Sequence, residues 1–144
     1  RKVEAKGARR TGAIGRPLGG GFTSVNVSLR QHFDLYANVR PALSSPGATT
    51  RYSDIDILTV RENMEGLYSG DGQTLSPDGE RAELKSVVTR TGSQRVLKYA
   101  FELAQRLGRK KVTVVHKANI MKSTSGLFLD MAREVAANYP AIEC

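Results

Sequence analysis

The sequence contains very little cysteine: its one cysteine, Cys144, is the last of 144 residues. A single thiol cannot form a disulfide framework or a cysteine-based metal site. The sequence also has no tryptophan and no apolar run long enough to cross a membrane as a helix. The basic first sixteen residues lack an apolar stretch, so they are not typical of a secretory signal. These absences argue against membrane proteins and secreted disulfide-rich domains, and they favour a reducing intracellular compartment.

The composition, 40% hydrophobic and 25% charged, is typical of a soluble domain with a real core. The formal net charge of +8 suggests an anionic partner. Nucleic acid is the usual partner of such a charge, and a polycarboxylate or a nucleotide cofactor is the other possibility. The basic residues are spread along the chain and do not form a stripe interleaved with aromatic side chains. We therefore interpret the charge as a solvated basic surface with a basic N-terminal stretch, and expect no nucleic acid.

Helical and strand patterns alternate along the first half of the chain. A helix is expected from Thr23 or Ser24, where a hydroxyl serves as N-cap, and Val25, Leu29 and Phe33 give it one apolar stripe. A short strand follows at 35–41 and is expected to end at Pro41. After a loop, the β-branched run 55–60 predicts a buried strand.

The second half begins with turn signals and continues with two strong helical patterns. Glycine, proline and Asp-Gly signals within 67–86 predict a hairpin arm. A helix is expected at 91–107, with Gly108 beyond its end. A second buried strand is expected at 111–116, and a second helix at 123–138 before Pro140. The inward face of the first helix is predicted to hold Val96, Ala100, Leu103, Ala104 and Leu107, and that of the second Leu127, Phe128, Met131, Ala132, Val135 and Ala136. Together these elements predict an α/β fold around a mostly parallel sheet.

Arg30, Arg40 and Arg61 stand at or near the ends of expected elements. Guanidinium groups bind carboxylates in a bidentate manner, so three that converge would suit a substrate with several carboxylates. From spacing alone, three ordinary surface arginines are the more common arrangement. Lys117 follows the expected strand 111–116, where partial desolvation would suit proton transfer, although a strand-end lysine that reaches into solvent is more common. Tyr68 is a candidate acid or a packing residue, and neither a metal-ligand spacing nor a nucleophile motif is present.

Three stretches together carry a resemblance: "PLGGGFTSVNVSLRQHFDLYANVRP", "RENMEGLYSG" and "VHKANIMKSTSGLF". They closely resemble the NAD-linked isocitrate dehydrogenases of the β-decarboxylating dehydrogenase family. The match runs from about Pro17 to Pro140, nearly the whole chain, but it covers well under half of a typical member. The resemblance implies an incomplete α/β fold of the isopropylmalate dehydrogenase type with a β-hairpin dimerisation arm.

The resemblance also implies roles for individual residues. Substrate carboxylates would be bound by five side chains: Ser24, Asn26, Arg30, Arg40 and Arg61. The catalytic acid would be Tyr68, which protonates the enolate left when CO₂ departs. The catalytic base would be Lys117, supplied to the neighbouring subunit's site, and Asn119 would lie near the nicotinamide. The implied cofactors are NAD or NADP and Mg²⁺ or Mn²⁺, whose ligands are expected outside this chain.

Residues near Arg30 bear on the choice of substrate. The resemblance places Ser24 and Asn26 at the third carboxylate of isocitrate, where isopropylmalate-type members usually carry apolar residues. Isocitrate is therefore favoured over homoisocitrate, isopropylmalate or tartrate. A regulatory, non-catalytic subunit is a further alternative, against which the presence of both Tyr68 and Lys117 argues. A nucleic-acid-binding domain rests on the net charge alone.

The sequence departs from the family pattern at three positions. Arg16 stands where threonine is usual, Met64 interrupts the common "RENTEG" and Ser125 replaces an aspartate. The changes at Met64 and Ser125 bear on fine geometry and leave the chemistry in place.

The resemblance implies a division into four parts and an oligomeric enzyme. Residues 1–35 would belong to a large domain, 36–65 and 91–144 to a small domain, and 66–90 to the dimerisation arm. A homodimer or related oligomer is expected, located in the cytoplasm or, in a eukaryote, in the mitochondrial matrix. Because the metal and nucleotide ligands are expected elsewhere, the 144 residues alone are predicted to be inactive.

Overall fold

A computed structural model describes residues 25–45, 47 and 51–144 of the chain. The chain divides into two compact units, Arg1–Leu35 and Tyr36–Cys144.

In the first unit, the described residues form the helix α2 (Val25–His32). The predicted helix is confirmed, whereas its expected N-cap, Thr23 or Ser24, lies outside the described residues. The predicted stripe of Val25, Leu29 and Phe33 is between 37% and 48% exposed, so it forms no buried core within the described part of the chain.

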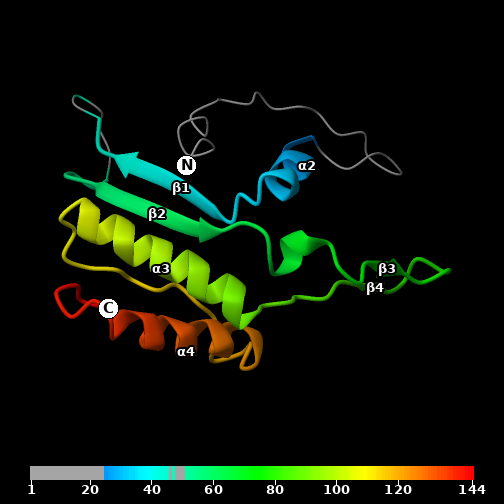
Figure 1. Cartoon of the computed structure of the whole chain (residues 1–144). Coiled ribbons are helices and arrows are strands. Elements are labelled where there is room, and N and C mark those ends of the chain that lie inside the picture. Colours follow the sequence, from blue (N-terminus) through cyan, green and yellow to red (C-terminus); the bar gives the residue numbers. More distant parts are fainter. Residues whose placement is uncertain (1–24, 46, 48–50) are drawn as a thin grey trace. The chain divides into compact units, whose positions relative to one another are not determined.

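The second unit begins with an antiparallel pair of strands, β1 (Ala37–Leu43) and β2 (Asp56–Glu62), which lie side by side in Figure 1. The sequence predicts that Pro41 ends the first strand, but β1 continues through it. Two backbone hydrogen bonds lie at the ends of the pair, from Ser44 N to Ile55 O and from Asn63 N to Tyr36 O. They show that the backbone N–H and C=O groups of the odd-numbered residues of β2 point toward β1. Pro41 pairs with Leu58 and therefore exchanges no ladder bonds, so its missing N–H falls on the free edge.

The two faces of this β1–β2 ribbon differ in what they contact. Ala37 of β1 and Val60 of β2 pack against the core of the unit. Because successive side chains of a strand alternate, the intervening residues lie on the opposite face. Ile57 is on that opposite face and is 56% exposed, so the predicted buried strand is wrong: β2 is only half-buried, with Val60 packed against the core.

The helix α3 (Arg90–Arg106) confirms the predicted helix at 91–107. It starts at the N-cap Thr89, whose Oγ1 accepts a hydrogen bond from Gly92 N, and ends where Gly108 takes a left-handed φ of 66°. The predicted inward face is partly wrong, since Leu107 is 51% exposed while Phe101 is fully buried. The face is rotated toward Phe101 because α3 contacts both β2 and a second helix.

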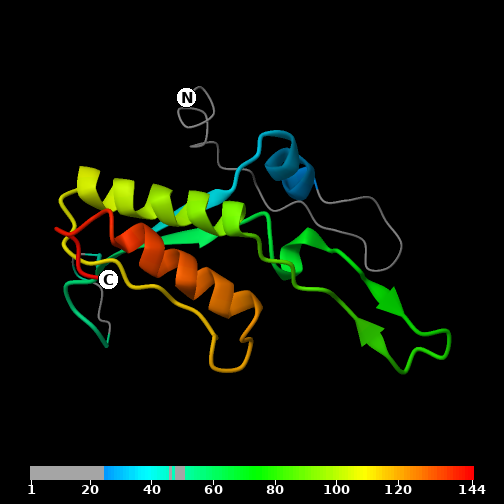
Figure 2. The same ribbon diagram turned by 60° about the horizontal axis from the view of Figure 1, so that its bottom comes forward.

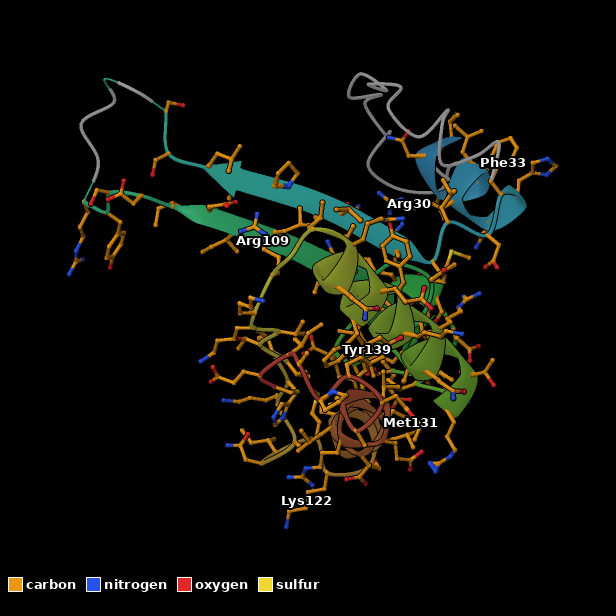
Figure 3. The ribbon with its side chains drawn as sticks, turned by 60° about the vertical axis from the view of Figure 1, so that its left-hand side comes forward. Arg30, Phe33, Arg109, Lys122, Met131 and Tyr139 are labelled. Carbon is orange, nitrogen blue, oxygen red and sulfur yellow. The ribbon has the colours of Figure 1, made fainter. Side chains whose placement is uncertain are left out.

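That second helix, α4 (Thr124–Ala136), lies beside α3 and confirms the prediction at 123–138 within two residues at each end (Figure 2). The core of the unit is made by apolar side chains of both helices and the C-terminal segment: Val96, Leu97, Phe101, Ala104, Met131, Ala132, Val135 and Ile142. Phe101 stacks on Tyr139 at a centroid distance of 5.2 Å, and Figure 3 shows Tyr139 between the two helices. Burying a side chain such as Phe101 contributes about 1.5–3 kcal/mol, which holds the helix pair together.

The predicted hairpin arm is confirmed as a narrow ribbon of β3 (Thr74–Leu75) and β4 (Ala82–Glu83). Figures 1 and 2 both show it running away from the helices of its unit. At its tip the Ser76 hydroxyl donates to the Asp78 carboxylate, and this bond lowers the pKa of Asp78 below its usual value. Leu75 is 68% exposed, so the arm carries an apolar side chain on a solvent-facing surface.

The strand predicted at 111–116 is wrong as a strand. The segment is extended, but its only ladder contact among the described residues is an isolated parallel bridge between Lys111 and Glu143. Val112 and Val114 pack against the core, whereas Val115 is 87% exposed. The predicted mostly parallel sheet is also wrong for the described residues, whose two strand pairs are antiparallel. The pattern of apolar residues predicts which side chains face the core, but it does not predict which strand pairs with which.

Candidate functional site

The second unit places two of the predicted arginines on one sheet face. In the β1–β2 register Asn38 is opposite Arg61, and Arg40 is opposite Thr59. Side chains of directly opposed residues share a face, and diagonal neighbours lie about 7–8 Å apart. Arg40 and Arg61 are such a diagonal pair, on the face away from the helices. Asn38 shares this face with both, and its Oδ1 accepts a hydrogen bond of 3.3 Å from Arg40 Nε.

Arg61 also contacts the predicted catalytic tyrosine. Its guanidinium lies over the ring of Tyr68, 4.3 Å from the centroid. Tyr68 lies in a short 3₁₀ turn, η1 (Leu67–Ser69), and is 63% exposed. A cation over an aromatic face is attracted by the ring quadrupole, by about 0.5–1 kcal/mol at an exposed site. The contact brings the Arg61 guanidinium and the Tyr68 phenol together on one surface.

The segment that joins Arg61 to Tyr68 is held by the Glu62 side chain. Its carboxylate accepts hydrogen bonds from Met64 N at 2.9 Å and Glu65 N at 2.7 Å. Gly66 then takes a φ of 73°, a left-handed conformation that a β-carbon would strain, and starts the turn. The chain after β2 therefore follows one hydrogen-bonded path up to Tyr68.

The Glu65 side chain ties the same segment to the start of α3. Its Oε2 accepts from Thr89 N at 2.9 Å, and its Oε1 accepts from Thr89 Oγ1 at 2.5 Å. A second link runs from Gly66 N to Val87 O at 2.8 Å. A carboxylate is favourable at this place because the N–H groups of a helix's first turn carry partial positive charge.

A hollow of about 1040 Å³ lies between β2 and the extended segment 111–116, with side chains of α3 and α4 along it. Arg61 and Tyr68 line it together with His116 and Ser125. Leu58 and Val60 also line the hollow, and their backbone N–H and C=O groups point away from β1. The hollow joins the arginine–tyrosine pair to the segment that leads to Lys117.

The predicted base and the predicted cofactor residue lie in the turn after that segment. Lys117 and Asn119 are both exposed. The Lys117 carbonyl accepts hydrogen bonds from Ile120 N and Met121 N, which begin the turn into α4. Lys117 thus has the more common of the two arrangements, a lysine that reaches into solvent, because the segment before it is not covered as a buried strand would be. Neither side chain is brought to Tyr68 within the described residues.

The remaining predicted ligands belong to the first unit. Asn26 and Arg30 both lie on α2, four residues apart and hence on neighbouring turns of one face. Arg30 O accepts a hydrogen bond of 2.9 Å from Leu35 N, which closes the turn after the helix. Ser24 and Arg16 lie outside the described residues.

An ion pair fixes the start of β2. Arg109 Nη2 lies 2.6 Å from Asp56 Oδ1, and its Nη1 donates to Asp56 O at 3.2 Å. Figure 3 shows Arg109 beside the strand. The hydrogen bond from Arg109 lowers the pKa of Asp56 and raises the pKa of Arg109, because it favours the charged form of both groups.

Within residues 25–45, 47 and 51–144, no cluster of three or more His, Cys, Asp or Glu side chains could hold a metal ion. The described residues therefore do not form a divalent-metal site, and no chemical step through a metal is assigned to them. No helix in this part of the chain is long and apolar enough to cross a membrane.

Sequence reasoning missed three residues that shape the site: Asn38, Glu62 and Glu65. Asn38 alternates with Arg40, a spacing that places both on one face of a strand, but only the register sets it opposite Arg61. The two glutamates act through backbone N–H groups. Glu65 does so across 24 residues, for which no local sequence signal exists.

Comparison with known proteins agrees with the motifs and the fold. The family model described as isocitrate/isopropylmalate dehydrogenase matches residues 2–144. The chain belongs to this family. The predicted resemblance and the predicted α/β fold of that family are thereby confirmed, as is the prediction that the chain corresponds to only part of a member.

Individual members of the isocitrate/isopropylmalate dehydrogenase family are similar over most of the chain. A mitochondrial NAD isocitrate dehydrogenase catalytic subunit of Arabidopsis thaliana is 52% identical over 132 residues, 91% of this chain and 34% of that protein. A mitochondrial NAD isocitrate dehydrogenase regulatory subunit of Dictyostelium discoideum is 48% identical, over 92% of this chain and 37% of its own length. The crystal structure of isocitrate dehydrogenase from Methylococcus capsulatus matches with a TM-score of 0.84 at 56% identity, over 90% of this chain and 39% of the other. The chain thus spans little more than a third of these relatives.

Proposed function

We propose that these 144 residues are a segment of an NAD-linked isocitrate dehydrogenase, which oxidises isocitrate and decarboxylates it to 2-oxoglutarate. The observation that carries the proposal is the contact of Arg61 with Tyr68, on a sheet face that also holds Arg40, in a chain of this family. An isocitrate trianion needs several cationic groups, and paired guanidinium groups supply them with fixed geometry.

Each candidate residue has a distinct role in this proposal. Arg30, Arg40 and Arg61 bind substrate carboxylates, and Ser24 and Asn26 hydrogen-bond the third of them. The Tyr68 hydroxyl gives its proton to the carbon from which CO₂ departs, while Lys117 Nζ takes up the proton of the substrate hydroxyl. Asn119 lies at the nicotinamide end of NAD or NADP. Mg²⁺ or Mn²⁺ belongs to the proposal for the whole protein, with ligands outside the residues described.

The proposal includes an oligomer, a homodimer in the simplest case. Residues 66–90 form its dimerisation arm, 1–35 belong to a large domain, and 36–65 with 91–144 to a small domain. The arm's exposed Leu75 and narrow ribbon suit a surface that is covered in an assembly. The compartment is the mitochondrial matrix or the cytoplasm, and the cycle in which isocitrate is oxidised is the tricarboxylic acid cycle.

Kinetics of the complete polypeptide that contains these residues test the substrate. We expect NAD reduction with isocitrate, at a kcat/KM well above that with homoisocitrate, isopropylmalate or tartrate. An Asn26→Ala change should reduce kcat/KM for isocitrate more than for the other three acids. A preference for another of these acids would contradict the assignment, whereas the isolated 144 residues should show no activity with any of them.

Subunit mixing tests the roles of Tyr68 and Lys117 in an oligomer. Tyr68→Phe should lower kcat by roughly 10²–10⁴-fold because it removes the general acid. Lys117→Met should also inactivate the homodimer. If Lys117 serves the partner's site, a mixture of the two variants regains about a quarter of wild-type activity, since half of the dimers have one intact site. Absence of any regain would place both groups in the same subunit's site.

The second candidate is a regulatory subunit that binds isocitrate without turning it over. The 48% identity to a Dictyostelium discoideum regulatory subunit favours it. Isothermal titration with isocitrate separates the two: binding together with NAD reduction supports the catalytic assignment, and binding without turnover supports the regulatory one.

A further inference from the structure

The position of Tyr68 depends on its backbone more than on its own side chain. Its phenol makes no hydrogen bond to any described residue, and its ring has the Arg61 guanidinium as its contact. With 63% of the residue exposed, little packing holds the ring. The path of the chain through the η1 turn must therefore set where the hydroxyl lies.

Glu65 is the side chain that connects this path to the rigid part of the unit. Three residues before Tyr68, its carboxylate accepts both the N–H and the hydroxyl of Thr89, at 2.9 and 2.5 Å. Thr89 is the N-cap of α3, and its Oγ1 in turn accepts from Gly92 N at 3.0 Å. The Glu65 carboxylate is thus fixed to a helix whose inner face is the core of the unit.

The fit of the carboxylate against α3 leaves no spare room. A β-carbon built on Gly92 would lie 2.1 Å from Glu65 Oε1 and 2.3 Å from its Cδ. The glycine is buried and has no positive φ, so the backbone conformation does not require it. Its missing side chain instead makes the space that the Glu65 carboxylate occupies.

We propose that Glu65 is a positioning residue for Tyr68: held at the N-terminus of α3, its carboxylate keeps the loop that carries Tyr68 beneath the Arg61 guanidinium. This inference rests on the proposed function, since it assumes that Tyr68 is the proton donor. Glu65 does not contact the reacting atoms. It acts by reducing the number of conformations from which Tyr68 must reach its reactive position, which is an entropic contribution to turnover.

A double-mutant cycle in the complete protein tests this role. Glu65→Ala should lower kcat at least 10-fold while KM for isocitrate changes less than 3-fold, since Arg40 and Arg61 remain in the sheet. Glu65→Gln keeps one acceptor oxygen for Thr89 and should recover part of the lost kcat. In a Tyr68→Phe background, Glu65→Ala should have no further effect on kcat, because the group that it positions is gone.

A glutamate of α4 that pairs with Arg90, the first residue of α3, provides the control. Glu134 pairs with Arg90 at 3.0 Å, and both groups are 59% exposed. Glu134→Gln should leave kcat unchanged in both backgrounds. Hydrogen exchange gives a readout without activity: Glu65→Ala should speed exchange of the Gly66 amide, whose acceptor is Val87 O.

The outcomes separate this inference from the proposed function. If Glu65→Ala and Glu65→Gln leave kcat unchanged, or if Glu65→Ala lowers kcat by the same factor with and without Tyr68, the positioning role is overturned. If Tyr68→Phe itself leaves turnover unchanged, the proposed role of Tyr68 fails first. A fall in kcat that disappears in the Tyr68→Phe background supports both.

Discussion

The two segments that carry the proposed proton-transfer groups differ in how they are held. The segment 62–70 has its backbone bonded to the side chain of Glu62 and, through Glu65, to the N-terminus of α3. In the segment 113–117, no backbone N–H donates a hydrogen bond to another described residue, and Val115 is 87% exposed. The backbone before Tyr68 is held by hydrogen bonds among the described residues, whereas the backbone before Lys117 is not.

If the two residues have the proposed roles, the segment that carries Tyr68 is preorganised and the segment that carries Lys117 is not. A preorganised group contributes more to catalysis because its ordering does not have to occur during the reaction. Three places test the difference: the contact of Glu65 with Gly92, the segment 113–117, and the ion pair of Asp56 in β2 with Arg109.

The largest effect is expected from Gly92→Ala. The new methyl group would displace the Glu65 carboxylate from Thr89, at a cost of about 1.5–3 kcal/mol for charged hydrogen bonds. Alanine recovers up to about 1 kcal/mol through its helix propensity. We expect a net loss of about 1–2 kcal/mol in the free energy of unfolding, measured by urea denaturation.

Gly126→Ala is the matched control, because Gly126 occupies the same third helical position in α4. A β-carbon there has no atom within 4 Å. This change should stabilise the protein by about 0.5–1 kcal/mol. Equal effects of the two substitutions would contradict the tight contact between Glu65 and α3.

Hydrogen exchange of the 144-residue chain should reveal the next largest difference. The amides of Glu65, Gly66 and Thr89 each have an acceptor, whereas those of Thr113 and Val115 have none among the described residues. We expect exchange at the first three to be slower by at least roughly 10-fold, since protection requires a bond that must open. Similar rates in both groups would show that the two segments are equally ordered.

The smallest effect is expected at the exposed pair of Asp56 and Arg109. The folded-state pKa of Asp56 is lowered from its ordinary value of 3.8, so its contribution to stability is complete above that value. The contribution is lost as pH falls from 3.8 through the lowered pKa. Asp56→Asn should flatten this part of the acid unfolding profile, followed by circular dichroism, and leave stability near pH 7 slightly reduced. An unchanged acid limb would contradict the pairing.

The elements that the sequence predicted well are those whose signals are local. Gly108 was predicted to follow the end of α3, and the apolar period of this helix needs no information from elsewhere in the chain. The arm follows from its turn residues in the same way. The cationic residues Arg40 and Arg61 were found by their chemistry and their family motif, and the register then placed them on one face.

The elements that were missed depend on distant partners. The run 111–116 has the composition of a strand, but a strand exists only where another backbone lies beside it. Pro41 is compatible with β1 only because its nitrogen faces the free edge. The burial of Phe101, rather than Leu107, depends on the contact of α3 with both β2 and α4.

The sequence by itself determined the helices, the glycine that follows α3, the turn-rich arm, the family and the residue types of the candidate site. These properties follow from side chains that act on their own neighbourhood, or from motifs that persist along the chain. Only the tertiary structure decided that β1 and β2 pair antiparallel, that Arg61 covers Tyr68, and that Glu65 reaches Thr89. The reason is physical: each of these contacts forms between groups that folding brings together. Hydrogen-bonding partners far apart in the chain produce no periodic pattern in the sequence from which they could be predicted.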